Sequence, residues 1–439
     1  MSGRNPADFR KKLSRTNELP LLYAVLLFQF AAMLLIAFRG SAADAFSLRV
    51  CVLLPAGTLV GLEILKRLWP IDRASYILVA FLCSLSVILL RAVFVLPDRA
   101  RDQAQFLGIG FAALLFGAFF IRRVRSWEKL SRVCIPLCLA VLALPFFFSN
   151  SSAKNWVRLG GVQCQPSELM KPVATVIFAA GFSTKRGVRG WWAYALFGAF
   201  ACGILLLQRD LGAMFLYFAL TLAMFYAGTG NGKVTLAILI LAATGVALAL
   251  YKIDWIAEKI PAFRYAAERV RLWKDPWASA YDGAYQIVQG LISIVSGGVF
   301  GSGLGLGSAN RVSVVASDYI FAAVSEEFGI AFAICVLAVY LCLLLRWMSA
   351  AMNARQRFHA LVAFGCAFEM IAQMLLIVCG NLHLIPLTGV TLPFVSEGGS
   401  SLTACLAQTG MVLGVSSINA QDEFDDLCRV NGGLWREPE

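Results

Sequence analysis

Residues 275–286 read Asp275-Pro276-Trp277-Ala278-Ser279-Ala280-Tyr281-Asp282-Gly283-Ala284-Tyr285-Gln286. They lie in a polar segment, residues 252–316, that begins charged and ends rich in glycine. This is the only long segment between the chain ends that cannot cross a bilayer as an apolar helix. We therefore expect a large loop, where water, a polar substrate and chemistry can meet.

The rest of the chain is strongly apolar. Of its 439 residues 59% are hydrophobic and 15% are charged, and the mean hydropathy is +0.74. A soluble domain carries about 25% charged residues. Repeated apolar runs of about 18 residues or more therefore predict an all-α polytopic membrane protein.

We expect about twelve membrane spans, one of them over residues 317–345. The expected segments are a basic N-terminal segment (1–18), N-terminal spans (19–149), a first motif region (150–251), the large loop (252–316), C-terminal spans (317–417) and a tail (418–439). The tail is acidic, and we expect it to be disordered from residue 421 onward.

Lysine and arginine predict the orientation. With the N-terminus inside, the inside segments hold about twenty Lys and Arg residues and the short outside loops about seven. This bias predicts cytoplasmic termini and an extracytoplasmic large loop. It also accounts for the net charge of +12 without a nucleic-acid partner. With two histidines and no paired Cys-x-x-Cys spacing, Cys and His residues predict no metal site.

Besides the large loop, three polar segments lie outside in this orientation, residues 150–171, 208–212 and 380–401. A further polar cluster, residues 317–329, follows the loop at the start of the next span. We therefore expect one composite, outward-facing site. Glu168 and Lys171 are one helical turn apart at a membrane edge, where charges usually face a cavity or each other. The tight turn with Arg209 and Asp210 is expected to be buried among helices.

Two further segments are rich in glycine. Irregular backbone at membrane depth, as in residues 388–401, survives only against a cavity or protein, and its successive amides can bind an anion such as phosphate. Residues 297–307 follow no strand and carry no Gly-Lys-Ser or Gly-Lys-Thr, so they predict tight backbone packing and no nucleotide site.

The motifs resemble those of the SEDS (shape, elongation, division and sporulation) family, the FtsW/RodA/SpoVE proteins. The matching stretches are Asn155-Trp156-Val157-Arg158-Leu159-Gly160, Gln165-Pro166-Ser167-Glu168-Leu169-Met170-Lys171, Gln208-Arg209-Asp210-Leu211-Gly212, Ala284-Tyr285-Gln286, Ser317-Asp318-Tyr319-Ile320-Phe321-Ala322, Glu326-Glu327-Phe328-Gly329 and residues 388–401. The resemblance implies a core of ten spans. Five spans precede the Trp156 motif where the family has three, so two additional N-terminal spans are expected.

The resemblance also implies an activity. Family members polymerise lipid II, the undecaprenyl-pyrophosphate-linked disaccharide-pentapeptide, into peptidoglycan glycan strands in the bacterial cell membrane. They pair with a class B penicillin-binding protein and other division or elongation proteins. A divalent cation, Mg or Mn, supports the reaction, and no nucleotide is involved.

The resemblance implies a substrate-binding set. Its members are Trp156, Arg158, Glu168, Lys171, Gln208, Asp210, Tyr285, Gln286, Asp318, Glu326, Glu327, Thr391, Ser396, Gly398, Gly399, Ser400 and Ser401. The family's catalytic aspartate falls, without a gap, on Ser279 of this chain. A serine hydroxyl alone is no base near neutral pH, so Asp282 or Asp275 is the expected substitute.

Three functions remain open at this point. The first is a lipid II glycosyltransferase with Asp282 as the base. The second is a scaffold that holds lipid II or a penicillin-binding protein without chemistry. The third is lipid II translocation along interior charges such as Glu168, Lys171, Asp210 and Glu326.

Overall fold

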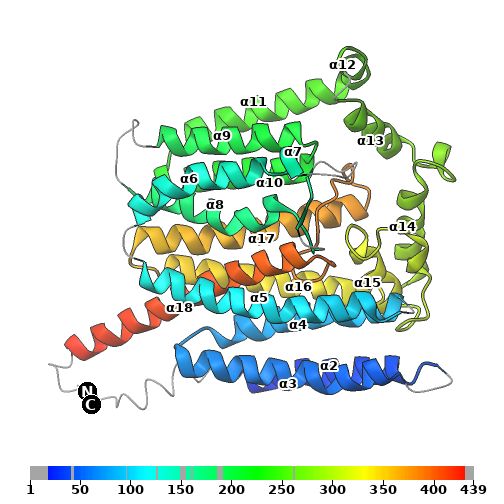
Figure 1. The fold of residues 1–439 in the computed structure, drawn as a ribbon, viewed down its shortest axis with the longest axis horizontal. Helices are drawn as coiled ribbons and strands as arrows, with labels where there is room; N and C mark the ends of the chain where they lie inside the picture. Colours follow the sequence, from blue (N-terminus) through cyan, green and yellow to red (C-terminus); the bar gives the residue numbers. More distant parts are fainter. Residues whose placement is uncertain are drawn as a thin grey trace.

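The structure is a computed structural model that describes residues 18–40, 44–94, 96–124, 127–148, 155–159, 162–184, 191–260 and 263–430. Its long helices lie side by side in one bundle (Figure 1). Their bounds are α2 Leu19–Ala37, α3 Ala45–Leu68, α4 Arg73–Val93, α5 Asp98–Arg123, α6 Trp127–Ala143, α7 Pro145–Phe148, α8 Pro166–Ser183, α9 Trp192–Leu207, α10 Leu211–Thr229, α11 Gly232–Tyr251, α15 Ile320–Phe328, α16 Ile330–Met352, α17 Arg357–Asn381 and α18 Gly399–Val430.

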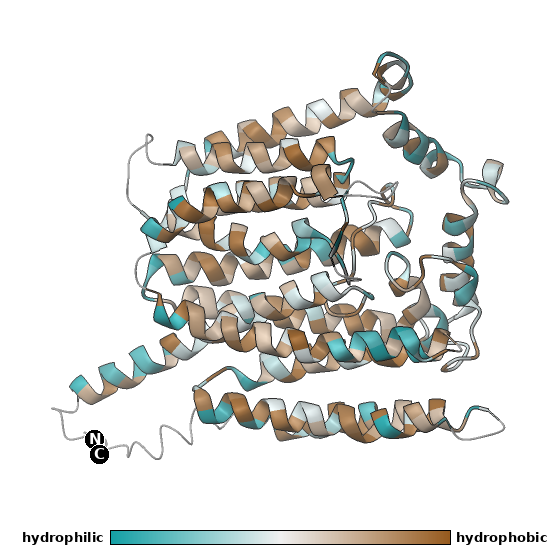
Figure 2. Cartoon of the chain, in the orientation of Figure 1, coloured by the Kyte–Doolittle hydropathy of each residue, from teal (hydrophilic) through white to brown (hydrophobic). Residues whose placement is uncertain are grey.

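Ten helical segments in the described part of the chain are long and apolar enough to cross a membrane. The sequence predicted twelve spans; two of these, over α8 and α9, correspond to helices of the bundle that are not among the ten. Figure 2 shows hydrophobic residues throughout the bundle and hydrophilic residues concentrated on α13 and the free end of α18. The prediction of an all-α polytopic membrane protein is confirmed.

The large loop is mostly helical. It contains α12 (Ile253–Lys259), α13 (Arg264–Lys274), the 3-10 turn η3 (Trp277–Ser279), α14 (Tyr285–Ser296) and the 3-10 turn η4 (Ala309–Arg311). These elements cover one end of the bundle, the loop end, on the right of Figure 1; helix α2 begins and helix α18 ends at the opposite end. The glycine-rich run packs tightly, as predicted, because a Cβ atom at Gly297 would collide with the carbonyl oxygen of Ser325.

Three expectations about local structure were wrong. The span expected over residues 317–345 is broken at Gly329, whose φ of 84° favours glycine, so α15 and α16 are separate helices. Helix α18 continues through the tail to Val430, where disorder was expected. A short antiparallel hairpin, β1 (Val157–Leu159) with β2 (Val162–Cys164), was not predicted.

Helices α5 and α18 approach each other closely through glycines. A Cβ atom at Gly117 would collide with the carbonyl oxygen of Ala407, and one at Gly410 with that of Leu114. A Cβ atom at Gly414 would lie 2.9 Å from the carbonyl oxygen of Ala118. Small residues allow such approach in membranes, where van der Waals contact drives helix association. This contact holds residues 407–414 of α18, the helix that follows the polar segment 388–398, against α5.

The substitution Gly410→Ala is expected to lower the thermal unfolding temperature in detergent, because overpacking costs about 1–3 kcal/mol. The matched control is Gly108→Ala on α5, where nothing lies within 4 Å of an added Cβ atom. That control should be neutral or slightly stabilising, since alanine favours helix more than glycine. Equal unfolding temperatures for the two variants would contradict the close approach.

Candidate functional site

A buried ion pair lies at the start of α8. Pro166 occupies the first turn of this helix and Gln165 precedes it, so Glu168 and Lys171 fall one turn apart on one face. Lys171 Nζ lies 2.7 Å from Glu168 Oε1, and the two side chains are only 2% and 5% exposed. Of the two expected environments, a cavity or the other charge, the structure shows the second. Such a pair is stable only when further hydrogen bonds compensate for lost water.

Those further bonds run from α8 to α17 and on to segment 388–401. Lys171 Nζ also donates to Gln373 Oε1 at 2.7 Å. Gln373 Nε2 donates to the carbonyl oxygen and the hydroxyl of Thr391, at 2.8 and 3.1 Å. The hydroxyls of Thr391 and Ser401 are 2.7 Å apart. One chain of polar contacts therefore joins two of the four predicted clusters, and we call it the polar centre.

A second buried carboxylate lies within the bundle near this pair. Glu369 of α17 is 2% exposed, and its Oε2 accepts from Gln408 Nε2 at 2.7 Å and from Thr175 Oγ1 at 3.3 Å. Glu369 is not among the residues predicted from the sequence, although an acid inside a span is rare and usually functional. That rarity was the signal that could have identified it.

Asp210 brings a third cluster to the polar centre. Its Oδ2 accepts from Asn155 Nδ2 at 3.0 Å and Gln165 Nε2 at 2.9 Å, while Oδ1 caps α10 through the amide of Ala213. Asp210 is buried as predicted. Arg209 is exposed, with φ of 63°, so the expectation that both charges of this turn are buried was wrong for Arg209.

Asp318 belongs to the fourth cluster. Its carbonyl oxygen accepts from Asn381 Nδ2 at 2.7 Å, which ties residues 317–319 to the end of α17. Burial raises the pKa of the Asp318 carboxyl, and a hydrogen bond from Ser317 and the charge of Arg269 partly oppose this. Arg269 of α13 donates to the carbonyl oxygen of Leu387 at 2.9 Å, so the large loop is anchored over this edge.

Several predicted binding residues have structural hydrogen bonds. The Ser396 hydroxyl donates to the carbonyl oxygen of Ser317 at 2.6 Å, and Gln208 Nε2 donates to that of Leu142 at 2.6 Å. Three more predicted residues form hydrogen bonds: the Gly398 amide donates to Gln103 Oε1, Ser400 Oγ accepts from the Gln165 amide, and Gln286 Nε2 donates to Ser313 Oγ. Gly399 lies against Phe106. Trp156 is half-buried, and Arg158 and Tyr285 are exposed. Glu326 and Glu327 hold the glycine-rich run, as described below.

The three candidate catalytic residues lie in the turn between α13 and α14. Asp275 Oδ1 accepts from the amide of Ala278 at 3.1 Å and so caps η3. Asp282 is exposed, and its amide donates to the carbonyl oxygen of Ser279. Figure 1 shows this turn at the outer edge of the loop end, beyond α8, the helix that carries both Glu168 and Lys171. The four clusters are brought together, whereas this turn lies outside them.

Two buried atoms of the polar centre are available to a ligand. Glu168 Oε2 and Ser167 Oγ have no hydrogen-bond partner among the residues that the structure describes. An unsatisfied buried polar atom costs about 1–3 kcal/mol, so it requires a water, an ion or a ligand. The polar centre can therefore accept a hydrogen bond or a cation at Glu168 and donate one at Ser167.

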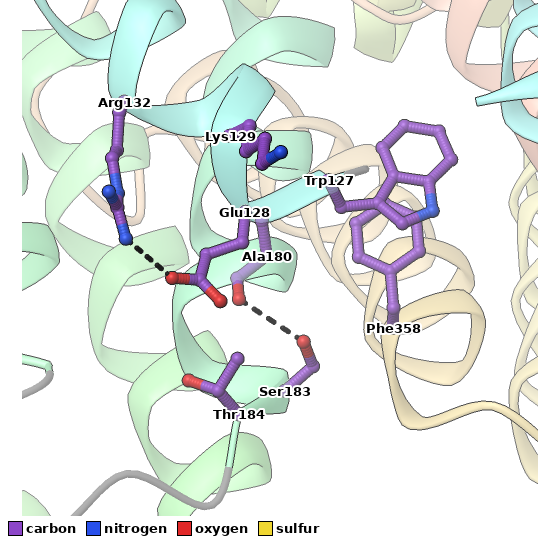
Figure 3. A pocket seen from close by; sticks show the side chains of 8 residues that line it. All are labelled: Trp127, Glu128, Lys129, Arg132, Ala180, Ser183, Thr184 and Phe358. Atoms are coloured by element: carbon purple, nitrogen blue, oxygen red, sulfur yellow. Dashed lines mark hydrogen bonds and ion pairs between the residues drawn. The ribbon is translucent and has the colours of Figure 1, made fainter. Parts of the chain in front are cut away.

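A cavity of about 390 Å³ lies at the opposite end of the bundle (Figure 3). Trp127 stacks on Phe358 with the ring centroids 4.0 Å apart, and Arg132 Nη2 lies 2.7 Å from Glu128 Oε1. Its lining residues are Trp127, Glu128, Lys129, Arg132, Ala180, Ser183, Thr184 and Phe358. None of them belongs to the polar centre, so this cavity is separate from the candidate site.

The chain matches the family model of the FtsW/RodA/SpoVE cell cycle proteins over residues 73–421. It is 31% identical to peptidoglycan glycosyltransferase RodA of Mycobacterium tuberculosis over 326 residues, covering 70% of this chain and 67% of that protein. It is 30% identical to stage V sporulation protein E of Bacillus subtilis, covering 72% of this chain and 86% of that protein.

Solved structures resemble the fold. A chain from a peptidoglycan synthase complex, described as coordinating polymerization and crosslinking, superposes with a TM-score of 0.65 at 26% identity, covering 80% of this chain and 99% of that one. RodA of Thermus thermophilus superposes with a TM-score of 0.58 at 25% identity, covering 79% and 96%.

Removing one partner of the buried pair should be strongly destabilising. Lys171→Ala leaves the Glu168 carboxylate without its cation, at a cost of about 3–5 kcal/mol, and thermal unfolding in detergent measures the loss. The matched control is Lys66→Ala, which breaks an exposed pair of the same spacing with Glu63 at 2.9 Å. That change should cost at most about 1 kcal/mol. Equal losses would mean that the Lys171 pair is solvated.

Proposed function

The chain belongs to the FtsW/RodA/SpoVE family, and from this premise we propose that it is a peptidoglycan glycosyltransferase that polymerises lipid II into glycan strands. The observation that carries the proposal is the extent of the family match, residues 73–421, which contains the whole polar centre and the large loop. The chain is a multi-pass membrane protein, and it serves bacterial cell-wall synthesis in division or cell shape.

The proposed reaction forms one carbon–oxygen bond, breaks another and transfers one proton. The acceptor sugar hydroxyl attacks the anomeric carbon of the donor, and the bond from that carbon to the pyrophosphate oxygen breaks. The pyrophosphate leaves with the electron pair, and the hydroxyl proton passes to a carboxylate base. Asp282 takes the base role in our proposal: it is exposed at the loop end, where lipid-linked sugars can reach it.

The departing pyrophosphate needs donors and positive charge. The Ser167 hydroxyl has no partner among the described residues, and the Thr391–Ser401 hydroxyl pair lies beside the Lys171 network. Preorganised donors of this kind stabilise charge that develops during reaction. We assign the stabilisation of the departing pyrophosphate to the polar centre, and the role of the base to the large loop.

In our proposal a divalent cation binds at the polar centre, where the protein and the substrate pyrophosphate hold it together. The described residues hold no group of three or more His, Cys, Asp or Glu suited to a metal ion. Mg²⁺, however, often binds through one or two carboxylates together with substrate phosphates and water. Glu168 Oε2 is a buried carboxylate oxygen without a described partner. When bound there, Mg²⁺ or Mn²⁺ would neutralise pyrophosphate charge.

The partner in our proposal is a class B penicillin-binding protein, a transpeptidase that crosslinks the strands. The resemblance to a complex that coordinates polymerization with crosslinking supports this choice. One observation favours a second function, a scaffold that holds lipid II or the transpeptidase without polymerising. Ser279 stands at the position where the resemblance places the catalytic aspartate, and the neighbouring Asp275 is engaged as a cap.

Polymerisation of labelled lipid II by the purified chain with its transpeptidase partner separates the two functions. Asp282→Ala should lower the rate about 10²–10⁴-fold, the usual contribution of a general base. Glu258→Ala, which removes an exposed acid from α12 of the same loop, should leave the rate unchanged. Polymerisation by Asp282→Ala at the parent rate excludes this base. Partner capture with no polymer under any metal condition supports the scaffold.

The orientation is a separate proposal, based on the distribution of Lys and Arg, with both termini cytoplasmic. An alkaline phosphatase fused after residue 260, in the large loop, should be active, since that enzyme folds only outside the cytoplasm. A green fluorescent protein fused after residue 439 should fluoresce. An inactive phosphatase at residue 260 with a dark C-terminal fusion would reverse the assignment.

A further inference from the structure

The N-terminal hairpin of α2 and α3 lies outside the matched family residues 73–421. It is nevertheless anchored to the rest of the bundle. Arg91 of α4 pairs with Asp44 at the start of α3, at 2.7 Å. Phe28 of α2 packs against Phe328 and Phe332, with ring centroids 6.0 and 5.7 Å apart. The hairpin thus contacts the end of α15 and the start of α16, beside the glycine-rich run.

Arg39, just after α2, extends from this hairpin to the glycine-rich run. Its Nη1 donates to the carbonyl oxygen of Ala92 at 2.9 Å, which fixes the direction of the side chain. The side chain crosses directly over Gly305, where an added Cβ atom would collide with Nη1 and lie 2.7 Å from Cζ. Gly305 has a φ of 74°, so both its conformation and this contact require glycine.

The same run is bound from the other side by two acids of α15. The Gly305 amide donates to Glu327 Oε2. Glu326 Oε1 accepts from the amide and hydroxyl of Ser308, at 2.6 and 3.0 Å. The backbones are also joined, since the amides of Ser302 and Gly303 donate to the carbonyl oxygens of Glu326 and Glu327, at 2.7 and 3.1 Å.

The two acids at this contact are both buried, but they are not equally satisfied by hydrogen bonds. Glu326 and Glu327 are 1% and 3% exposed, and Glu326 Oε2 has no hydrogen-bond partner in the described part of the chain. The pKa of Glu327 is raised to about 7, mainly by burial and also by the charge of Glu326. The amides of Gly305 and Gly307 and the charge of Arg39 oppose the rise. Arg39 is thus the cation that favours the ionised form of Glu327.

We propose that Arg39 is a positioning residue: it packs across Gly305 beside Glu327, and so makes the N-terminal hairpin part of the support of the glycine-rich run. Through this run the hairpin acts on the end of α15, the helix that begins directly after Asp318 and Tyr319. Arg39 contacts none of the candidate reacting groups. The proposed consequence for catalysis, though not the positioning itself, rests on the proposed function.

The pH dependence of the folding stability allows the proposal to be tested without substrate. A carboxyl whose folded-state pKa is raised from 4.5 to about 7 contributes stability at low pH that is lost as the pH rises through this range. Removing Arg39 disfavours the ionised form further. Arg39→Ala should therefore lower the thermal unfolding temperature little at about pH 5.5 and by about 2 °C or more at about pH 8.

The experiment is a double-mutant cycle on the full chain in detergent at both pH values. It compares the parent, Arg39→Ala, Glu327→Gln and the double variant, with Arg39→Lys as the charge-conserving variant and Arg49→Ala as the matched control. Arg49 is an exposed arginine of the same hairpin. Arg39→Lys should restore most of the loss at the higher pH, Arg49→Ala should have no effect, and Glu327→Gln should abolish the pH-dependent effect of Arg39→Ala.

A loss that is equal at both pH values, or that persists in the Glu327→Gln background, overturns the proposal. If Arg39→Ala is not recovered folded, Arg39→Gln replaces it in the cycle with the same criteria. A lipid II polymerisation assay then tests the catalytic consequence, expected as a severalfold loss in Arg39→Ala that Arg39→Lys restores. An inactive parent chain with an intact unfolding cycle would contradict the proposed function and leave the positioning role supported.

Discussion

The buried ion pair of Glu168 and Lys171 is the constraint on which the loop end depends. Two charges with almost no exposure are tolerated only when hydrogen bonds replace the lost water. Here Gln373 accepts a hydrogen bond from Lys171 and donates one to Thr391. Contacts from three separate parts of the chain therefore offset the cost of burying the pair. The pair therefore determines where α8, α17 and segment 388–401 meet.

The same principle explains the irregular backbone near the site. Broken segments at membrane depth need partners for their amides and carbonyls. The Leu392 amide donates to Ser396 Oγ, and Gln103 of α5 serves both the carbonyl oxygen of Ser396 and the amide of Gly398. On the other side, Glu326 and Glu327 serve the glycine-rich run. Polar side chains in the core thus support loops, and Ser167 Oγ and Glu168 Oε2 are two of the buried atoms that have no hydrogen-bond partner among the described residues.

The site divides into a buried half and an exposed half. The polar centre is enclosed by helices, whereas Asp282 lies on the outer turn of the large loop. The bonds from Arg269 to Leu387 and from Trp273 to His383 fix the loop over the bundle and set the relation between the two halves.

The sequence by itself determined the class of fold and the gathering of four polar clusters at one end, because hydropathy and chain direction are local properties that survive without coordinates. It also placed Glu168 and Lys171 one helical turn apart, since a spacing of three residues fixes a helical face, but whether they face a cavity or each other was decided by the tertiary structure. Only the tertiary structure decided the break at Gly329, the exposure of Arg209, the burial of Glu369 beside Gln408, and the reach of Arg39 to Gly305. These features depend on which distant segments pack together, and residues separated by hundreds of positions leave no periodic signal in a single sequence.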